Sequence, residues 1–357
     1  MRICFVVHTF DKRDRGGVLR VISQLANQLV NYYDVDILSF GCVDEQAYKI
    51  DRRIKLISLN MMNYNTSYYN GLKKINWFRE AFNCIYRKLS NDTIWITSSP
   101  PISLLFSLLK LRNEKLRVIG CDHTSTLYTK NFFIQKLRNF LLSRLDIMVA
   151  LTPQDQEYYK SNGIKSVCIP NGIDLKNISK EHNNRRFLIY VGRLNEEKQP
   201  FKAIDFYMSS SLPKENIKMK IYGHGDYEQE VNTYINEHGL ENFIQVIKGE
   251  TDPSVIYKDA FALILTSKIE GFGLVLVEAM SRNIPCLSFE IPYGPLNIIR
   301  ESVNGFFISD DGSDFDEKIL LIKGLSLDKI HSSISEYDSE KVMKKWEKLI
   351  LECYESI

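Results

Sequence analysis

The chain has 357 residues, which is long for one domain and enough for two domains of roughly 150–200 residues each. Its 44% hydrophobic and 25% charged residues match an ordinary soluble globular protein and exclude a disordered chain. The seven cysteines are scattered and never spaced as CxxC, which argues against a disulfide framework or a zinc site and for a reducing compartment.

The formal net charge of +2 is unevenly distributed. Residues 1–170 hold 24 basic and 14 acidic residues, whereas residues 171–357 hold 22 basic and 30 acidic residues. Residues 71–144 alone hold 13 basic and 4 acidic residues, which gives a net charge of +9. The 71–144 segment is either a solvated basic face or a surface for anionic lipid head groups or a phosphorylated acceptor. We expect no nucleic-acid partner, because no recognition motif accompanies the charge.

No window reaches the roughly 18–20 apolar residues of a membrane span, and the N-terminus lacks the long apolar region of a signal peptide. We therefore expect a cytoplasmic protein, peripheral on the inner face of the plasma membrane, which binds the anionic membrane surface through its basic N-terminal domain. Within that domain, basic residues share a helical segment with an apolar set that we expect to pack on the sheet. The basic residues are Lys73, Lys74, Arg79, Arg87 and Lys88, and the apolar set is Leu72, Ile75, Phe78, Phe82, Ile85 and Leu89.

In the first half of the chain, short apolar runs alternate with segments of helical periodicity, which predicts a parallel sheet with crossover helices. Strands are expected at Ile3–Val7, Val35–Ser39, Lys55–Leu59, Thr93–Thr97, Arg117–Gly120 and Ile147–Leu151. Helices are expected at 18–29, 72–89, 101–112 and 131–145.

The pattern restarts after Ile169-Pro170-Asn171-Gly172, where proline and Asn-Gly predict a linker. Strands are expected at Phe187–Val191, Lys218–Tyr222, Ile244–Ile247, Phe261–Leu265 and Cys286–Phe289, and helices from Phe201, up to about His238 and over Val275–Arg282. The predicted fold is α/β, with two doubly wound Rossmann-like domains facing each other across a cleft and ligands at the carboxyl ends of the strands.

The segment TSKIEGFGLVLVEAMSRNIPCLSFEIPYGP (266–295) is the most informative one. Glu270 follows a strand, and Gly271-Phe272-Gly273 separates it from Glu278. The glycines allow a sharp turn into a helix whose first N–H groups suit a diphosphate. Since a carboxylate would repel that diphosphate, each glutamate is expected to bind sugar or ribose hydroxyls.

This segment resembles the E-x7-E signature of glycosyltransferase family 4, whose members have the two-domain GT-B fold and retain anomeric configuration. The variant EGFGLVLVEAM, followed by YGPLNII and Asn304-Gly305-Phe306, is similar to members that build bacterial O-antigens and capsules. Four further motifs occur in the family's order, so the resemblance covers nearly the whole chain.

Two of these motifs lie in the first half. Arg15-Gly16-Gly17 is similar to the family's glycine loop that closes over the donor phosphates, although Leu19 stands where many relatives carry an acid. Gly120-Cys121-Asp122-His123-Thr124 matches the family position of a histidine beside the transferred sugar, which implies a catalytic role for His123. Without the resemblance, an ordinary turn and a structural histidine would explain them.

The other two lie in the second half. In VGRLNEEK (191–198), the resemblance makes Arg193 and Lys198 the pair that clamps the diphosphate. Two cations can neutralise the leaving group in place of a metal, and no Asp-x-Asp motif lies at the carboxyl end of an expected strand, so we expect no metal and no cofactor. YGHG (222–225) and VIKG (246–249) match loops that line the nucleotide pocket, although they could be simple turns.

The resemblance implies catalytic roles for His123 and Glu270. It implies donor binding by Gly16, Gly17, Arg193, Lys198, Gly223, Gly249, Gly271, Phe272, Gly273, Leu274, Val275 and Glu278. The implied domains are an acceptor-binding domain at 1–169, a nucleotide-sugar-binding domain at 170–335, and a helix at 336–357 that returns to the N-terminal domain. The face of that helix is Val342, Trp346, Leu349, Ile350 and Tyr354.

The implied activity is a retaining, metal-independent transfer of a hexosyl or N-acetylhexosaminyl unit from a nucleotide diphosphate sugar, for which UDP is favoured. The implied acceptor is an undecaprenyl-diphosphate-linked glycan in O-antigen, lipopolysaccharide or capsule biosynthesis. Two alternatives remain. A GT-B-fold sugar-nucleotide epimerase would need no acceptor, and a noncatalytic membrane-associated scaffold would not need the complete set of Arg193, Lys198, Glu270 and Glu278.

Overall fold

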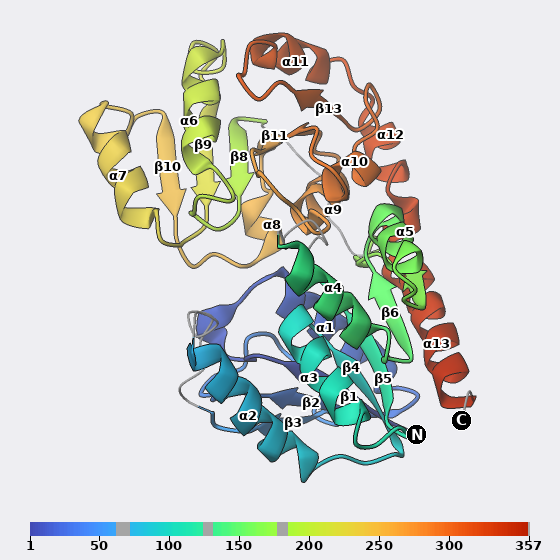
Figure 1. The fold of residues 1–357 in the computed structure, drawn as a ribbon. Helices are drawn as coiled ribbons and strands as arrows, with labels where there is room; N and C mark the ends of the chain where they lie inside the picture. Colours follow the sequence, from blue (N-terminus) through green and yellow to red (C-terminus); the bar gives the residue numbers. More distant parts are fainter. Residues whose placement is uncertain (62–71, 124–130, 177–184, 356–357) are drawn as a thin grey trace. The chain divides into compact units, whose positions relative to one another are not determined.

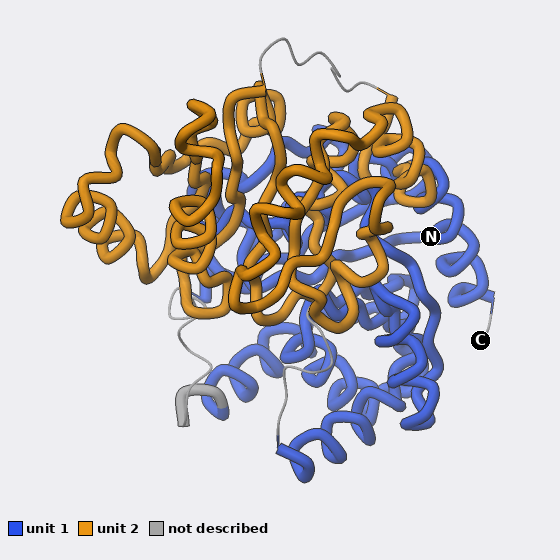
Figure 2. The backbone as a smooth tube through the Cα atoms, turned by 90° about the horizontal axis from the view of Figure 1, so that it is seen from above, with its two compact units in different colours: residues 1–172, 340–357 blue, residues 173–339 orange. Residues whose placement is uncertain are grey.

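The computed structural model describes residues 1–61, 72–123, 131–176 and 185–355 (Figure 1). The chain forms two compact units, of which unit 1 comprises Met1–Gly172 and Glu340–Ile357, and unit 2 comprises Ile173–Ser339 (Figure 2). Each unit is built on one parallel sheet.

The sheet of unit 1 has seven strands in the order β3-β2-β1-β4-β5-β6-β7. The strands are β1 (Arg2–Val7), β2 (Asp34–Ser39), β3 (Lys55–Ser58), β4 (Thr93–Thr97), β5 (Arg117–Cys121), β6 (Ile147–Ala150) and β7 (Ser166–Cys168). The helices are η1 (Lys12–Asp14), α1 (Gly17–Leu29), α2 (Leu72–Tyr86), α3 (Pro100–Lys110), α4 (Phe132–Leu142), α5 (Pro153–Ser161) and α13 (Ser339–Glu355). All strands and helices predicted for this half are present. The sequence interpretation missed α5, because its polar sequence lacks an apolar period.

Helices cover both faces of this sheet. Ile3, Phe5 and Val7 of β1 belong to a core that includes side chains of α1 and α13. Cys4 and Val6 belong to a second core with side chains of α2, α3 and α5. The alternation follows from the period of two in a strand, and burial on both faces explains why the strands are almost continuously apolar.

Helix α2 buries most of the predicted apolar set, with Ile75 as the exception. Its fully buried residues are Trp77, Ala81 and Ile85, whereas Ile75 is exposed. Phe78, Phe82 and Leu89 are partly buried against the same core. The expected burial of Ile75 is therefore wrong, because the larger indole of Trp77 takes the inward face and Ile75 lies almost opposite on the helix. The side chains of residues 72–74 lie outside the described part.

The sheet of unit 2 has six strands in the order β10-β9-β8-β11-β12-β13. The strands are β8 (Phe187–Val191), β9 (Lys218–Tyr222), β10 (Ile244–Ile247), β11 (Ala260–Leu265), β12 (Cys286–Phe289) and β13 (Gly305–Ile308). The helices are α6 (Pro200–Ser209), α7 (Glu228–Glu237), α8 (Pro253–Ile256), α9 (Leu274–Met280), α10 (Gly294–Ile298), α11 (Phe315–Ile322), α12 (Leu327–Ser332) and η4 (Ser335–Tyr337). The sequence interpretation missed β13 and the helices α8, α10, α11 and α12.

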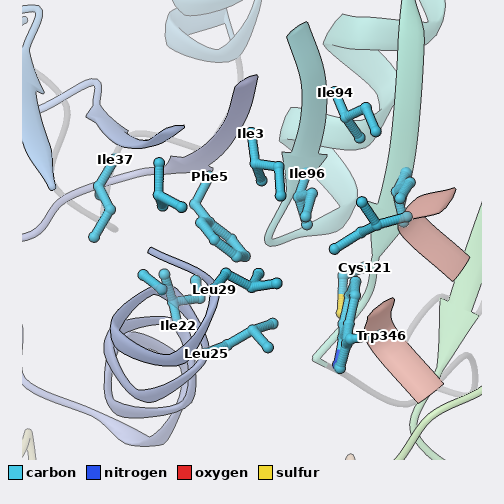
Figure 3. Close-up of a cluster of buried hydrophobic side chains, with 14 of the residues drawn as sticks. Ile3, Phe5, Ile22, Leu25, Leu29, Ile37, Ile94, Ile96, Cys121 and Trp346 are labelled. Carbon is cyan, nitrogen blue, oxygen red and sulfur yellow. The ribbon is translucent and has the colours of Figure 1, made fainter. Parts of the chain in front are cut away.

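The C-terminal helix α13 packs on unit 1, as predicted. Figure 3 shows Trp346 pointing toward Cys121 of β5 in the core that also contains Ile3 and Phe5. Tyr354 is exposed rather than buried, with the Arg117 guanidinium 4.8 Å from its ring centroid. The chain therefore crosses from unit 1 to unit 2 and returns.

We expect Trp346→Ala to destabilise unit 1. Trp346 is 6% exposed, so its removal leaves a cavity in a packed core. Such changes cost about 3–5 kcal/mol. Urea unfolding measures the loss, with Lys344→Ala on the exposed face of the same helix as the control. Equal unfolding free energies for the two variants would contradict the packing described.

Candidate functional site

Three neighbouring strands bring predicted donor-site residues to one edge of the unit 2 sheet. Strands β9, β8 and β11 are adjacent and parallel, so the loops that follow them leave from the same edge. Gly223 follows β9, Arg193 and Lys198 follow β8, and Glu270 follows β11.

The loop after β8 is held in shape by Tyr190, a buried residue of that strand. The Tyr190 hydroxyl lies 3.1 Å from the carbonyl oxygens of both Arg193 and Lys198, to which it donates. The Lys198 amide donates to Asn195 Oδ1 at 3.0 Å. These bonds fix the positions from which the Arg193 and Lys198 side chains extend.

The loop after β11 is tied to the loop after β8. The Thr266 hydroxyl donates to the carbonyl oxygens of Lys198 and Gln199 at 3.1 and 2.9 Å. The Lys268 amide donates to the Glu197 carbonyl at 2.8 Å. Movement of one loop is therefore constrained by the other.

Lys198 and Glu270 form an ion pair between these loops. Lys198 Nζ lies 2.5 Å from Glu270 Oε1, and the Ser267 hydroxyl donates to the same oxygen at 2.8 Å. The two side chains are only 19% and 12% exposed, whereas Arg193 is exposed. Because an ammonium has three N–H donors, Lys198 can keep its bond to Glu270 and still donate to a bound anion.

Gly223 allows the loops after β8 and β9 to approach closely. A Cβ atom at Gly223 would lie 1.9 Å from the Gly192 carbonyl oxygen, which no side chain tolerates. The Leu194 amide donates to the His224 carbonyl at 3.0 Å and joins the same two loops. Gly223 thus has a packing role next to the Arg193 loop, and Gly249 follows β10, the next strand in the sheet.

The turn after Glu270 leads directly into α9. Gly273 precedes Leu274 with a φ of +86°, a left-handed conformation that favours glycine. Phe272 is buried, and its ring meets Tyr337 edge-on at a centroid distance of 5.4 Å. Val275 and the rest of α9 follow, so the sharp turn expected from Gly271-Phe272-Gly273 is present.

Glu278 lies on α9 in an enclosed position. The residue is 5% exposed, and its Oε2 accepts a hydrogen bond of 2.8 Å from the Tyr257 hydroxyl. Tyr257 is fully buried, with the Arg282 guanidinium 5.2 Å from its ring centroid. The sequence interpretation expected Glu278 to bind sugar or ribose hydroxyls, and in the structure one of its carboxylate oxygens accepts from a buried phenol.

The glycine motif of unit 1 lies at the start of α1. Gly16 has a φ of −168°, an extended conformation that any residue adopts. The Arg15 guanidinium donates to the Ala47 carbonyl at 2.6 Å and fixes this turn. Leu19, which stands where many relatives carry an acid, is buried in the unit 1 core.

His123 follows β5, with its Nε2 3.5 Å from Cys121 Sγ. Burial lowers the pKa of His123 to about 4, although the charge of Asp122 opposes this shift. The imidazole is therefore neutral near pH 7. Asp122 itself is paired with Arg138 and accepts a hydrogen bond from Tyr159, while Thr124 lies outside the described residues.

Sequence reasoning missed the residues that hold these loops, above all Tyr190, Tyr257 and Thr266. Tyr190 lies in an expected apolar strand, and Tyr257 lies outside every expected element. The available signal was a hydroxyl placed at the carboxyl end of an apolar strand, as at Tyr190 in FLIYV and at Thr266 after β11. Tyr257 gave no such signal.

Two features are absent from the described ranges. There, no three His, Cys, Asp or Glu side chains gather as metal ligands would. In the same part of the chain, no helix combines the length and the apolar character needed to cross a bilayer.

Known proteins resemble this chain along almost its whole length. A family model described as "Glycosyl transferases group 1" matches residues 173–338, and one described as "Glycosyltransferase Family 4" matches residues 15–177. An uncharacterized glycosyltransferase of Haemophilus influenzae is 27% identical, with 94% of this chain and 96% of that protein covered.

Two characterised proteins are also similar. An alpha-1,4-N-acetyl-D-galactosaminyltransferase of Campylobacter jejuni, named for the acceptor GalNAc-alpha-(1->4)-GalNAc-alpha-(1->3)-diNAcBac-PP-undecaprenol, is 23% identical, with 99% of both chains covered. The crystal structure of a TarM variant from S. aureus, in complex with fondaparinux, alpha-GlcNAc-glycerol and UDP, has a TM-score of 0.78 at 17% identity, with 99% of both chains covered. This likeness confirms the predicted two-domain α/β fold.

The lowered pKa of His123 predicts a loss of stability in acid. The unfolded chain binds a proton at this residue below about pH 6.5, whereas the folded chain resists protonation down to about pH 4. The contribution of His123 to the free energy of unfolding is therefore complete above about pH 6.5, and it is lost as the pH falls toward about 4. We expect the urea unfolding free energy to fall across this window, less steeply in His123→Asn than in the exposed control His224→Asn. Identical pH dependence in both variants would contradict the burial of His123.

Proposed function

The chain belongs to the group 1 glycosyltransferases, and from this premise we propose that it moves a hexosyl or N-acetylhexosaminyl unit from a UDP-linked sugar to a lipid-linked oligosaccharide, with retention of anomeric configuration. The pathway we propose is the synthesis of a bacterial O-antigen, lipopolysaccharide or capsule. The observation that carries the proposal is the Lys198–Glu270 pair beside Arg193, at the carboxyl edge of the unit 2 sheet.

The names of similar proteins support the choice of substrates. The Campylobacter jejuni protein is named for an undecaprenyl-diphosphate-linked acceptor, and the TarM variant was crystallised with UDP. A carbohydrate acceptor on a lipid diphosphate would be anionic, which suits the net charge of +9 in residues 71–144. Unit 1, which carries Gly16 and Gly17 at the start of α1, would receive this acceptor, and the two glycines would bind the donor.

In this proposal, the donor diphosphate binds Arg193 and Lys198. Arg193 is exposed and can approach the phosphates as a fork of donors, while Lys198 contributes a compact charge. Glu270, held by Lys198 and Ser267, accepts hydrogen bonds from the sugar hydroxyls. The ion pair thus fixes the carboxylate before the donor arrives, which lowers the cost of ordering it during binding.

The nucleoside would bind on the other side of the diphosphate. Glu278 would accept from the ribose hydroxyls, with its carboxylate oriented by the Tyr257 hydroxyl. Gly223, Gly249 and the backbone of Gly271–Val275 would line the phosphate and base region. At Gly223 the close approach of the Gly192 carbonyl leaves no room for a side chain, so this position would offer main-chain contacts.

The transfer itself would proceed on one face of the sugar. The bond between the anomeric carbon and the leaving phosphate oxygen breaks as the acceptor oxygen bonds to that carbon from the same side. The acceptor proton passes to the leaving phosphate oxygen, so no protein base is required. His123, neutral near pH 7, would bind the sugar and stabilise its developing positive charge.

A donor panel tests the function and its metal independence together. Purified protein is incubated with UDP- and GDP-sugars, with or without an undecaprenyl-diphosphate disaccharide, in excess EDTA. We expect an acceptor extended by one sugar from a UDP-linked donor, with the anomeric configuration of the donor preserved in its NMR spectrum. Free sugar formed without acceptor would indicate an epimerase, and activity that EDTA abolishes and magnesium restores would refute metal independence.

We also expect Arg193→Ala and Lys198→Ala to weaken donor binding and turnover while the protein stays folded. Each removes a charge-assisted bond to the diphosphate, typically worth about 1.5–3 kcal/mol, or roughly 10–100-fold in affinity. The matched control is Lys323→Ala, which removes a surface lysine paired with Glu215 at 2.7 Å outside this edge of the sheet. Donor kinetics of both site variants that equal those of the control would refute the clamp.

A further inference from the structure

Helix α4 of unit 1, labelled in Figure 1, carries an exposed set of apolar side chains. Five large apolar side chains of this helix are between 57% and 80% exposed: Phe132, Phe133, Ile134, Leu137 and Phe140. A surface helix of a soluble protein normally shows the opposite arrangement, with its apolar stripe on the core. A patch of this kind marks an interaction site.

The inward face of α4 combines the buried Leu142 with polar side chains that bond to neighbouring elements. Arg138 pairs with Asp122, whose carboxylate also accepts a hydrogen bond of 3.2 Å from the Tyr159 hydroxyl. The Asn139 amide donates to the Tyr158 hydroxyl at 2.8 Å. Rotating α4 to bury its phenylalanines would break a buried ion pair, so the outward direction of the apolar face is fixed by the fold.

The same outward face carries positive charge. Phe133, Leu137, Phe140 and Arg144 follow one another at steps of four, three and four residues, which places them on one side of the helix. Lys136 and Arg144 are exposed and lie 5.2 and 5.1 Å from the ring centroids of Phe132 and Phe140. Residues 131–145 contain no acidic residue.

We propose that the five apolar side chains together with Lys136 and Arg144, the α4 surface, insert into the head-group region of an anionic lipid bilayer. Aromatic side chains flanked by lysine and arginine suit the boundary between acyl chains and head groups, and the basic ends can extend to lipid phosphates. A protein partner would have to supply an apolar groove bordered only by acids, whereas an anionic bilayer offers both properties everywhere. This inference places the membrane contact on α4 rather than on the basic face of 72–89, and it does not depend on sugar transfer.

A fluorescent reporter tests the insertion directly. The three native tryptophans, Trp77, Trp95 and Trp346, are at most 6% exposed, so they give little response to lipid. Phe133→Trp places an indole on the α4 surface, and Leu320→Trp places one at an exposed leucine of unit 2 as the control. With phosphatidylglycerol vesicles, we expect a blue shift and quenching by brominated acyl chains for Phe133→Trp only. No change for Phe133→Trp, or equal changes for both variants, would overturn the proposal.

Paired substitutions then separate the apolar and the basic contributions. We expect Phe132→Gln with Phe133→Gln to weaken partition into phosphatidylglycerol vesicles about 10-fold or more. Lys136→Gln with Arg144→Gln should weaken it by roughly 10-fold at low salt and have no effect at high salt. Leu320→Gln with Leu321→Gln is the matched control, because both leucines are exposed on α11. Circular dichroism confirms that each variant is folded.

Two outcomes would contradict the proposed binding of the α4 surface to an anionic bilayer. If wild-type protein dimerises in light scattering, and the phenylalanine pair abolishes dimerisation while vesicle binding is unchanged, the surface is an interface between copies. If phosphatidylcholine vesicles bind as strongly as phosphatidylglycerol vesicles, the basic residues do not select lipid charge. Either result would refute the proposal as stated.

Discussion

A parallel sheet imposes one constraint on which the whole candidate site depends: the carboxyl ends of all its strands lie at the same edge. In unit 2, this constraint brings Arg193 and Lys198 together with Glu270, although the chain separates them by three strands in sequence. Opposite charges placed so close attract each other, and Lys198 and Glu270 form an ion pair. The hydroxyls of Tyr190 and Thr266 then fix the backbone on both sides of that bond.

Much of this framework could be predicted from the sequence, because burial on both faces makes the strands nearly continuous apolar runs. Glycines and charged residues directly after such runs mark the loops at the sheet edge, as at Arg193 and Glu270. The supporting contacts could not be predicted, because they join residues distant in sequence through single hydroxyl groups. A periodicity analysis counts Tyr190 and Tyr257 only as hydrophobic residues. The folded chain shows which oxygen atom accepts a hydrogen bond from each hydroxyl group.

Two helices of unit 1, α2 and α4, show another limit of prediction from sequence. Periodicity locates a helix and its faces, but the neighbouring elements decide which face is buried. In α2, the indole of Trp77 takes the inward face, so Ile75 is exposed rather than buried. In α4, the carboxylate of Asp122 and the hydroxyl of Tyr158 attract the polar face inward, and the apolar face remains outside. Asp122 and Tyr158 both lie outside α4. The sequence of the helix alone therefore does not show that its apolar side chains point to solvent.

Asp122 connects the position of His123 with the orientation of helix α4 in unit 1. The residue follows β5 immediately before His123, and the family pattern gives it no role. Its carboxylate nevertheless determines which face of α4 meets the solvent, because Arg138 has to remain beside it. The edge of the unit 1 sheet that holds the proposed catalytic histidine therefore also orients the proposed membrane-binding surface. If the acceptor is anchored in a bilayer, as proposed, the site and the membrane contact have to stay in a fixed relation, and the buried ion pair next to His123 would supply that relation within unit 1.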